Sequence, residues 1–224
     1  MRAVAIDGPA GAGKSSIAKS LARALGFIYV DTGALYRAIG LYTLRKGVGI
    51  RDKEGIIALL PEIDVDIRYV GEEQHVFLNG GDVNGLIRTE EVSMAASAVS
   101  AVPEVRTFLL ETQRGLARRY SVVMDGRDIG TVILPDAACK IFLTASPEVR
   151  AKRRYDQLVE KGQEADYEAV LADLIRRDYD DSHREVAPLK LADDGVEVDT
   201  SELTLQESID LVIETAKKRL ENAQ

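Results

Sequence analysis

A glycine-rich loop directly after a short apolar run constrains this chain more than any other feature. Residues 3–6 (Ala-Val-Ala-Ile) predict a buried strand, and residues 8–15 (Gly-Pro-Ala-Gly-Ala-Gly-Lys-Ser) follow it. The loop fits the pattern G-x-x-x-x-G-K-[ST], whose backbone N–H groups form a nest for phosphate. Ile17, Leu21 and Leu25 recur at helical spacing, so a helix is expected to direct its positive end at the same phosphates. This order of strand, loop and helix predicts nucleotide binding.

The loop residues divide the work of holding a triphosphate. A lysine supplies a mobile positive charge for the β- and γ-phosphates, and a hydroxyl is a ligand for Mg²⁺. The alternative is a glycine-rich turn that matches by accident, which the strand before it and the helix behind it disfavour. We expect the triphosphate to be held by Gly8, Gly11, Ala12, Gly13, Lys14, Ser15 and Ser16.

Composition excludes several classes of protein. The net charge of −8 over 224 residues disfavours a general binder of nucleic acid, which would carry a basic excess. The single cysteine, Cys139, allows no internal disulfide and lies in an apolar stretch, so we interpret it as a core residue. The first apolar run ends at Asp7, and no apolar run reaches membrane-spanning length. We therefore expect a cytoplasmic protein with no membrane contact.

Strands and helices alternate along most of the chain, which predicts an α/β fold with a doubly wound, five-stranded parallel sheet flanked by helices. Expected strands cover residues 2–6, 27–30, 121–124, 139–143 and 196–198. Expected helices cover residues 13–25, 34–44, 52–60, 103–120 and 204–220, with two more opening at Ser146-Pro147 and near Asp166. On the helix at 103–120 we expect Val105, Phe108, Leu109, Thr112 and Leu116 to face inward.

Residues 63–102 follow a different pattern. Alternation through residues 65–69 and 76–78 predicts a hairpin with one wet face, and residues 89–101 are compatible with a helix. We interpret 63–102 as a lobe inserted into a core formed by residues 1–62 and 103–224.

Two turns at the carboxyl ends of core strands carry candidate chemistry, because open α/β sheets bind ligands at this edge. The first is Asp31-Thr32-Gly33, expected to be exposed. The second begins at Asp125, a candidate Mg²⁺ ligand directly or through water, followed by Arg127 and Asp128. The alternative for the second is a plain Asp-Gly turn with a surface ion pair.

Charged residues near the end of the helix from Asp166 form a third candidate. Arg177, Asp181 and Arg184 follow i, i+4, i+7 spacing and flank the apolar stripe of that helix, which favours a cleft over a solvated face. The basic residues at 150–154 are open to the same two interpretations, and we expect only one or two to be functional. A small chain with a phosphate-binding loop and several separate arginines favours a small-molecule kinase.

The chain resembles the bacterial cytidylate kinases (CMP/dCMP kinases), within the nucleoside monophosphate kinase family of P-loop proteins. The resemblance spans nearly the whole length. It is carried by residues 6–15 (IDGPAGAGKS), 29–37 (YVDTGALYR), 87–92 (IRTEEV), 125–132 (DGRDIGTV) and 186–189 (VAPL). The last three stretches are the most specific.

The resemblance implies a core with an inserted monophosphate-binding lobe, a short lid at about 148–165, and γ-phosphate transfer from ATP to CMP or dCMP with Mg²⁺. It implies that Lys14, Arg127, Arg177 and Arg184 act in catalysis, and that Ser15 and Asp125 hold the metal. It implies that CMP is bound by Thr32, Arg37, Ser97, Arg106, Arg127, Asp128, Arg177 and Asp181, with Asp181 on the sugar.

These implied roles agree with the chemistry of cytosine. A carboxylate such as Asp128 accepts a hydrogen bond from the exocyclic amine, whereas the O4 of uracil would face it as a second acceptor. We therefore predict CMP over UMP by about 1–3 kcal/mol per mismatched contact.

Alternatives remain open at this point. Another small-molecule P-loop kinase would act on UMP, AMP or shikimate, although Gly33 stands where shikimate kinases carry aspartate, and adenylate kinases usually have a longer lid. A regulatory module would bind nucleotide without turnover, and a nucleic-acid-binding P-loop protein would show steep salt dependence. We expect a monomer, since no coiled-coil heptads are present.

Overall fold

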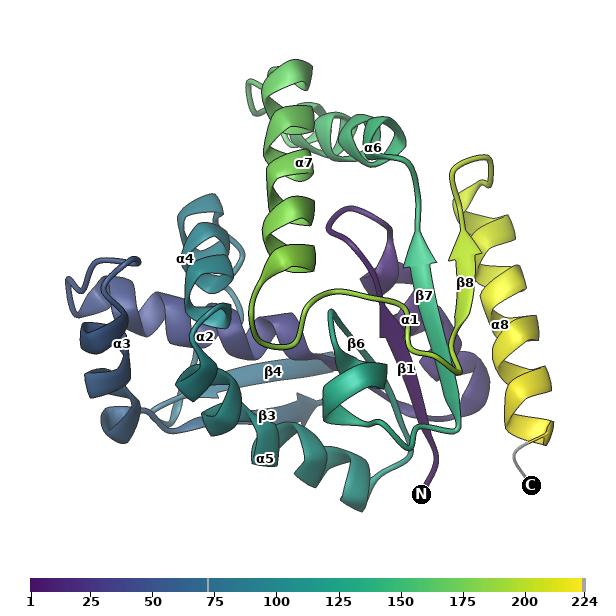
Figure 1. Cartoon of the computed structure of the whole chain (residues 1–224), viewed down its shortest axis with the longest axis horizontal. Helices are drawn as coiled ribbons and strands as arrows, with labels where there is room; N and C mark the ends of the chain where they lie inside the picture. The colour runs from purple at the N-terminus through teal and green to yellow at the C-terminus, as the bar shows by residue number, and fades with distance from the viewer. Residues whose placement is uncertain (72, 223–224) are drawn as a thin grey trace. The chain divides into compact units, whose positions relative to one another are not determined.

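The computed structural model describes residues 1–71 and 73–222, and within them it contains a five-stranded sheet in the order β2-β6-β1-β7-β8 (Figure 1). The strands are β1 (Ala3–Asp7), β2 (Ile28–Asp31), β6 (Val122–Gly126), β7 (Cys139–Thr144) and β8 (Val196–Asp199). β1 lies parallel to β6 and β7, and β7 lies parallel to β8. The predicted α/β fold with a five-stranded parallel sheet is confirmed.

The register of the central strands determines where the site is built. Ile6 pairs with Asp125 and Asp7 with Gly126, so β1 and β6 end at the same edge of the sheet. Their chains then leave that edge as the glycine-rich loop and as the turn at 126–128. Polar residues that are distant in sequence are therefore neighbours at one sheet edge.

An apolar core fastens two helices to this sheet. Ile17 and Leu21 of α1 (Lys14–Leu25) and Val212 and Leu220 of α8 (Leu205–Asn222) are buried against the strands. Cys139 belongs to the same cluster and is 2% exposed, and burial raises the pKa of its thiol to about 11. The prediction that this cysteine is a core residue is confirmed, because such a thiol stays protonated and apolar.

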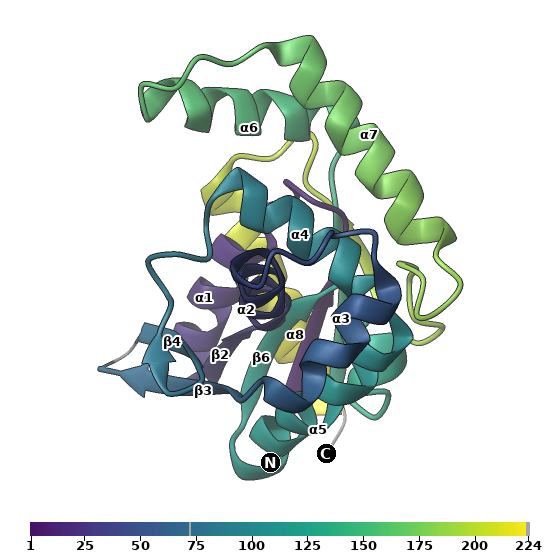
Figure 2. The same cartoon turned by 90° about the vertical axis from the view of Figure 1, so that its left-hand side faces the viewer.

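Helices α6 (Pro147–Glu160) and α7 (Tyr167–His183) pack against each other after β7 (Figures 1 and 2). Both begin as the sequence predicts. The Ser146 hydroxyl accepts a hydrogen bond from the backbone N–H of Val149, with Pro147 in the first turn, and the Asp166 carboxylate accepts from that of Glu168. None of the described helices is long and apolar enough to cross a membrane.

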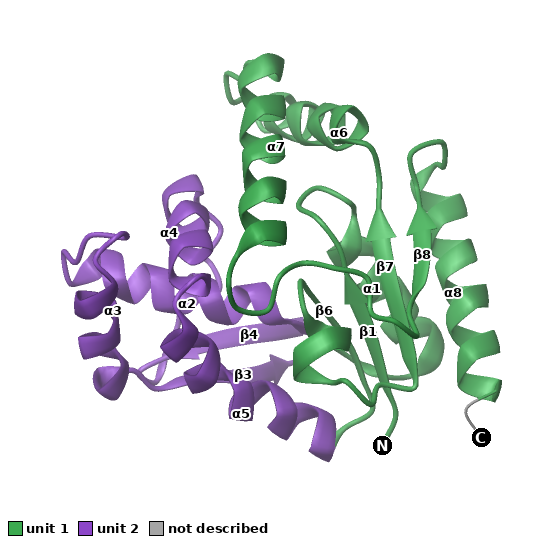
Figure 3. Cartoon of the chain, in the orientation of Figure 1, with its two compact units in different colours: residues 1–29, 120–224 green, residues 30–119 purple. Residues whose placement is uncertain are grey.

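The chain forms two compact units, residues 1–29 with 120–224 and residues 30–119 (Figure 3). The second contains α2 (Thr32–Arg45), α3 (Lys53–Leu59), the 3₁₀ turn η1 (Leu60–Glu62), α4 (Glu90–Ser100), α5 (Pro103–Arg119) and a small sheet. That sheet pairs β3 (Val65–Val70) with β4 (Glu73–Leu78) and β4 with β5 (Gly81–Asp82), all antiparallel, as the hairpin prediction required. The proposed borders of the inserted lobe, 63–102, lie within this unit and stay a prediction.

Close packing in the second unit depends on a glycine. A Cβ on Gly40 of α2 would lie 2.9 Å from the backbone nitrogen of Ala96 on α4. The two helices therefore approach each other at small residues, which holds α4 and its Ser97 in a fixed position along α2.

Two local expectations are wrong. Asp31-Thr32-Gly33 is not an exposed turn: Asp31 is 6% and Thr32 2% exposed, because the Asp31 carboxylate caps α2 by accepting from the backbone N–H of Ala34. On α5, Phe108 and Thr112 are only half-buried, while Gln113 is fully buried. The Gln113 amide nitrogen donates to the carbonyl oxygen of Leu109, which offsets part of the cost of burying this side chain, whereas its Oε1 has no partner among the described residues.

Candidate functional site

The loop between β1 and α1 is held by glycines at positive φ. Gly8, Gly11 and Gly13 have φ of 147°, 76° and 85°. A Cβ on Gly8 would lie 1.9 Å from the carbonyl oxygen of Leu143, so no other residue fits there. Gly13 precedes α1 without a side-chain cap, which leaves the first N–H groups of that helix available to an anion.

Lys14 is buried inside the loop that it serves. It is 7% exposed, and its Nζ donates to the carbonyl oxygen of Pro9 at 2.6 Å. Burial, followed by the positive charge of Arg127, lowers the pKa of Lys14 to about 7. An anionic phosphate beside Nζ would reverse this effect by favouring the charged form. The lysine is therefore placed to gain charge when a phosphate binds.

Oxygen atoms meet beside the loop. The Ser15 hydroxyl donates to Oδ2 of Asp125 at 2.9 Å, and the Tyr29 hydroxyl donates to Oδ1 at 3.1 Å. Hydroxyl and carboxylate oxygens are the donors that Mg²⁺ prefers, usually one or two from protein beside phosphate and water. Over the described residues, no group of three or more His, Cys, Asp or Glu side chains forms a separate metal cage. The donor set fits a cation shared with a bound triphosphate.

Two ion pairs connect the turn after β6 to the end of α7. Arg127 Nε donates to Oδ2 of Asp181 at 2.7 Å, and an Arg184 nitrogen lies 3.5 Å from Oδ1 of Asp128. Burial alone would raise the pKa of Asp181, but the charge and hydrogen bond of Arg127, together with the charges of Arg184 and Arg177, outweigh it and hold that pKa below its usual range. Four of the predicted site residues thus form one network of alternating charges.

Arg184 reaches this network from outside the helix. α7 ends at His183, and Arg184 is its C-cap in an extended conformation, so the predicted i+7 helical position is not the reason for its placement. Its Nε donates to the carbonyl oxygen of Ala187 at 2.6 Å, and Ala187 has a positive φ of 53°. The turn after α7 therefore orients this guanidinium.

Arg177 differs from Arg176, its neighbour on α7, which pairs with Asp173. The side chain is half-buried and makes no hydrogen bond or ion pair within the described part of the chain. Burial lowers the pKa of this guanidinium below its usual range, with the charge of Arg127 adding to the effect. A guanidinium that is partly desolvated and unpaired favours an anionic ligand.

The second unit holds the remaining predicted residues. Thr32 is the first residue of α2, and Arg37 lies one turn later, where its Nη2 donates to Oδ2 of Asp31 at 2.7 Å. Arg106 of α5 is 8% exposed, donates to the carbonyl oxygen of Ser100, and lies over the Tyr36 ring at 5.5 Å from its centroid. Ser97 is half-buried on α4. Thr32 and Arg37 thus share the start of α2, whereas Ser97 and Arg106 lie on α4 and α5.

Two buried charged residues, Arg150 and Asp7, also belong to this site, although the sequence did not assign a role to either of them. Arg150 is 3% exposed and donates to the carbonyl oxygens of Ala145 and of Ala10 in the phosphate loop. Asp7 is 5% exposed, and its two oxygens accept from the backbone N–H groups of Ile129 and Gly130 at 2.7 and 2.8 Å. Two signals in the sequence pointed to them: Arg150 is one of four basic residues in a five-residue run, and Asp7 directly follows the strand that was expected at residues 2–6.

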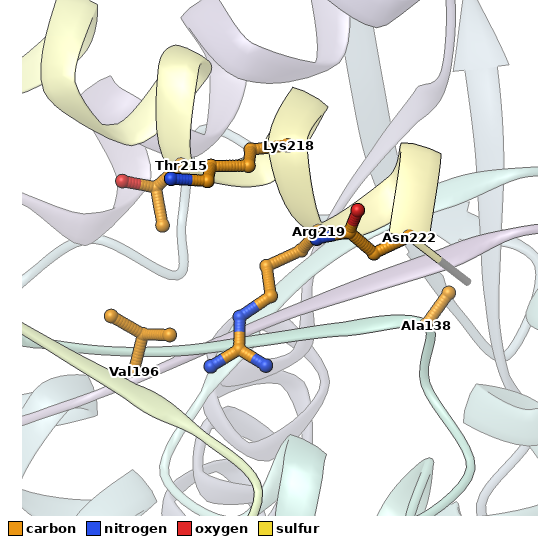
Figure 4. Close-up of a pocket in the computed structure, with 6 residues that line it drawn as sticks. All are labelled: Ala138, Val196, Thr215, Lys218, Arg219 and Asn222. Atoms are coloured by element: carbon orange, nitrogen blue, oxygen red, sulfur yellow. The ribbon is translucent and has the colours of Figure 1, made fainter.

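A hollow elsewhere in the first unit contains none of the predicted residues. It has a volume of about 460 Å³ and lies between α8 and the sheet, lined by Ala138, Val196, Thr215, Lys218, Arg219 and Asn222 (Figure 4). Lys218 and Arg219 are exposed surface residues there. The candidate site is therefore defined by the loop and the charge network.

Comparison with known proteins agrees with this geometry. The crystal structure of an uncharacterized protein from Eubacterium ventriosum covers 99% of each chain with a TM-score of 0.52 and 12% identity, which shows a shared fold. A parallel sheet with a phosphate loop, a buried lysine and a Ser–Asp pair defines a P-loop nucleotide-binding protein.

The sequence comparison is more specific. The family model for cytidylate kinase matches residues 4–218. A cytidylate kinase of Caldicellulosiruptor saccharolyticus is 49% identical over 98% of this chain and 97% of its own. One from Mycolicibacterium paratuberculosis is 51% identical over the same shares. The chain belongs to the cytidylate kinase family.

Proposed function

We propose that the protein transfers the γ-phosphoryl group of ATP to the phosphate of CMP or dCMP, giving ADP and CDP or dCDP. The observation that carries this is the shared sheet edge, where the phosphate loop with Lys14 and Ser15 leaves β1 and the Asp125–Asp128 turn leaves β6. Membership of the cytidylate kinase family supports the acceptor. A donor loop beside an arginine-rich network is what phosphoryl transfer between two anions requires.

The reaction needs positioning and charge neutralisation. An oxygen of the acceptor phosphate attacks the γ-phosphorus in line, the bond from that phosphorus to the β–γ bridging oxygen breaks, and ADP leaves. The loop N–H groups from Gly8 to Ser16 and the Lys14 ammonium hold the donor phosphates. Arg127, Arg177 and Arg184 stabilise the negative charge spread over the transferring group.

Mg²⁺ is the cation that we assign to the reaction. Ser15 and Asp125 would hold it with oxygen atoms of ATP, and it would neutralise charge on the β- and γ-phosphates. Tyr29 keeps the Asp125 carboxylate oriented through its hydrogen bond to Oδ1.

The acceptor residues keep the roles that the family resemblance suggests. Arg37 and Arg127 bind the acceptor phosphate, and Asp181 accepts from a sugar hydroxyl. Thr32, Ser97, Arg106 and Asp128 recognise cytosine by a set of donors and one acceptor. The ion pair of Asp128 with Arg184 supports this role, because it orients a carboxylate that can accept from the amine of cytosine.

We further propose a cytoplasmic monomer that binds nucleotide substrates and no nucleic acid. The acidic balance of −8 supports the last point. Among other acceptors, UMP is the nearest alternative, since it differs from CMP only at C4, the position that Asp128 would read, and in the proton on the adjacent N3.

A coupled ADP-release assay tests the proposal, with Mg·ATP and CMP, dCMP, UMP, AMP, GMP and shikimate in parallel. We expect strong turnover of CMP and dCMP, and kcat/KM for UMP lower by about tenfold or more, from one mismatched contact. If only another acceptor were turned over, that acceptor and not CMP would be the substrate. ATP binding without turnover of any acceptor would indicate a regulatory module. The Asp128→Asn variant checks base reading: it should narrow the CMP-to-UMP ratio, because an amide both donates and accepts.

A further inference from the structure

One carboxylate in the unit 30–119, that of Asp31, accepts hydrogen bonds from two guanidinium groups. Oδ2 of Asp31 accepts from Nη2 of Arg37 at 2.7 Å and from Nη2 of Arg88 at 3.4 Å. Oδ1 of the same side chain accepts from the backbone N–H of Ala34. Arg88 lies between β5 and α4, within the stretch 87–92 that carries part of the family resemblance.

Asp31 is fixed on both sides. Its backbone N–H donates to Oε1 of Gln74 at 2.7 Å, and Nε2 of Gln74 donates back to its carbonyl oxygen at 3.2 Å. A Cβ on Gly33 would lie 3.2 Å from Oδ1 of Asp31 and 3.3 Å from Nη1 of Arg37. The absence of a side chain at Gly33 thus leaves room for the carboxylate and the guanidinium to meet. The result is a carboxylate that determines where both arginines lie.

The local charge does not balance. Two guanidiniums share one carboxylate, which leaves one net positive charge at the start of α2, where the helix dipole adds to it. Nε of Arg37 is buried and has no hydrogen-bond partner among the residues that the structure describes. Arg88 has a side chain that is 58% exposed and uses a single N–H on Asp31. Several N–H donors therefore remain for an anion.

We propose that Arg88 is a further phosphate-binding residue beside Arg37 and Arg127, and that Asp31 aligns it with Arg37 to hold the phosphate monoester of the acceptor nucleotide. The proposal rests on the proposed function for the identity of that acceptor. A phosphate monoester carries up to two negative charges and three terminal oxygens, so it matches two forked cations better than one. The Asp31 carboxylate keeps the two guanidiniums from separating while no ligand is bound.

The competing interpretation is a surface ion pair without function. An exposed pair at 3.4 Å contributes little to stability, so its loss would leave every binding constant unchanged. If Arg88 had a purely structural role, its loss would instead lower the affinity for every ligand of this unit to a similar degree. Only the loss of a phosphate contact would lower the affinity for a nucleotide and leave the affinity for its nucleoside unchanged.

The test compares Arg88→Ala with wild type in binding CMP and cytidine by calorimetry, and in the KM values for CMP and ATP. Arg68→Ala is the matched control, because Arg68 is an equally exposed arginine of the same unit, paired with Asp66. We expect Arg88→Ala to lower the affinity for CMP by roughly 10- to 100-fold, as for a lost charge-assisted hydrogen bond. The affinity for cytidine and the KM for ATP should change less than twofold. Arg88→Lys should restore part of the loss.

Each outcome decides the proposal. Unchanged CMP affinity in Arg88→Ala, or an equal loss for CMP and cytidine, would overturn it. The wild-type control separates this failure from that of the proposed function: absence of CMP turnover in wild type overturns both, whereas normal turnover with an unaffected variant overturns only the role of Arg88. Because the side chain is exposed, the variant is expected to fold, which its thermal unfolding curve checks.

Discussion

Arg150 of α6 and Asp178 of α7 form an ion pair with an Nη2–Oδ2 distance of 2.5 Å, and the same guanidinium donates to the carbonyl oxygen of Ala10 at 3.0 Å. One side chain thereby connects the phosphate loop to both helices that follow β7. A Cβ on Gly11 would lie 3.2 Å from Cβ of Arg150, so the loop and α6 also meet at a residue without a side chain. This arrangement makes the position of the loop dependent on Arg150.

We expect Arg150→Ala to lower the free energy of unfolding by about 3–5 kcal/mol, because it leaves Asp178 half-buried without its cation. The loop would also lose a constraint, so the KM for ATP should rise while the KM for CMP changes less. Urea unfolding and steady-state kinetics measure the two effects. The control is Lys152→Ala on the same helix, where the pair with Asp156 is exposed and should contribute less than about 0.5 kcal/mol.

If both variants lowered the free energy of unfolding by the same small amount, the buried ion pair of Arg150 would contribute no more to stability than the exposed pair of Lys152. An Arg150→Ala variant that is destabilised but has normal KM values would limit the residue to a structural role.

The sequence predicted those features that local chemistry determines. The loop pattern and the helix starts at Ser146 and Asp166 depend on neighbours within a few residues, and each lies where it was expected. The hairpin followed from alternation, and the core strands from their apolar runs. These are short-range rules, and they transfer to a new chain directly.

Contacts over long sequence distances were not accessible in this way. Arg150 cannot be distinguished from Arg153 or Arg154 in the sequence, since only the packing of α7 decides which one is buried. The Asp31 carboxylate was expected to be exposed because it lies in a turn at the carboxyl end of a core strand, but its cap and its two arginines bury it. Resemblance to a family supplied the roles of the other arginines, which neither spacing nor charge determines.

Asp7 leads to a prediction about pH. Burial raises the pKa of this carboxyl from 3.8 to about 6, with the hydrogen bonds from Gly130 and Ile129 opposing the rise. The native state therefore binds a proton at pH values where the unfolded chain has lost it. Stability from this group is present below about pH 4 and is lost as the pH rises through 6.

We expect wild type to gain about 1 kcal/mol from Asp7 between pH 7 and pH 5, relative to Asp7→Asn, which has no such proton to bind. Urea unfolding of both proteins at the two pH values gives the difference, and other titrating groups cancel in it. Parallel pH dependences for the two proteins would mean that Asp7 has an ordinary pKa.

Lys14 leads to a prediction about proton uptake. With a pKa lowered to about 7 by burial and by Arg127, its side chain is largely neutral at pH 8 without ligand. Phosphate groups beside Nζ raise that pKa, so binding of Mg·ATP at pH 8 should take up as much as one proton. Calorimetry in two buffers of different ionisation enthalpy measures this number. Lys14→Met should bind more weakly without uptake, and equal uptake in both proteins would assign the proton to another group.

Arg184 is predicted to act on the transferring group more than on the bound nucleotide. Its guanidinium belongs to the network with Asp128 and Asp181, and the turn at Ala187 orients it. We expect Arg184→Ala to lower kcat by a factor of about 10² to 10³, as for removal of one charge stabiliser, and to change the Kd for Mg·ATP less than threefold. Arg176→Ala is the control, since that arginine lies exposed on α7 and forms an exposed ion pair with Asp173. Single-turnover kinetics with saturating CMP isolates the chemical step, and unchanged turnover in Arg184→Ala would place this arginine outside the reaction.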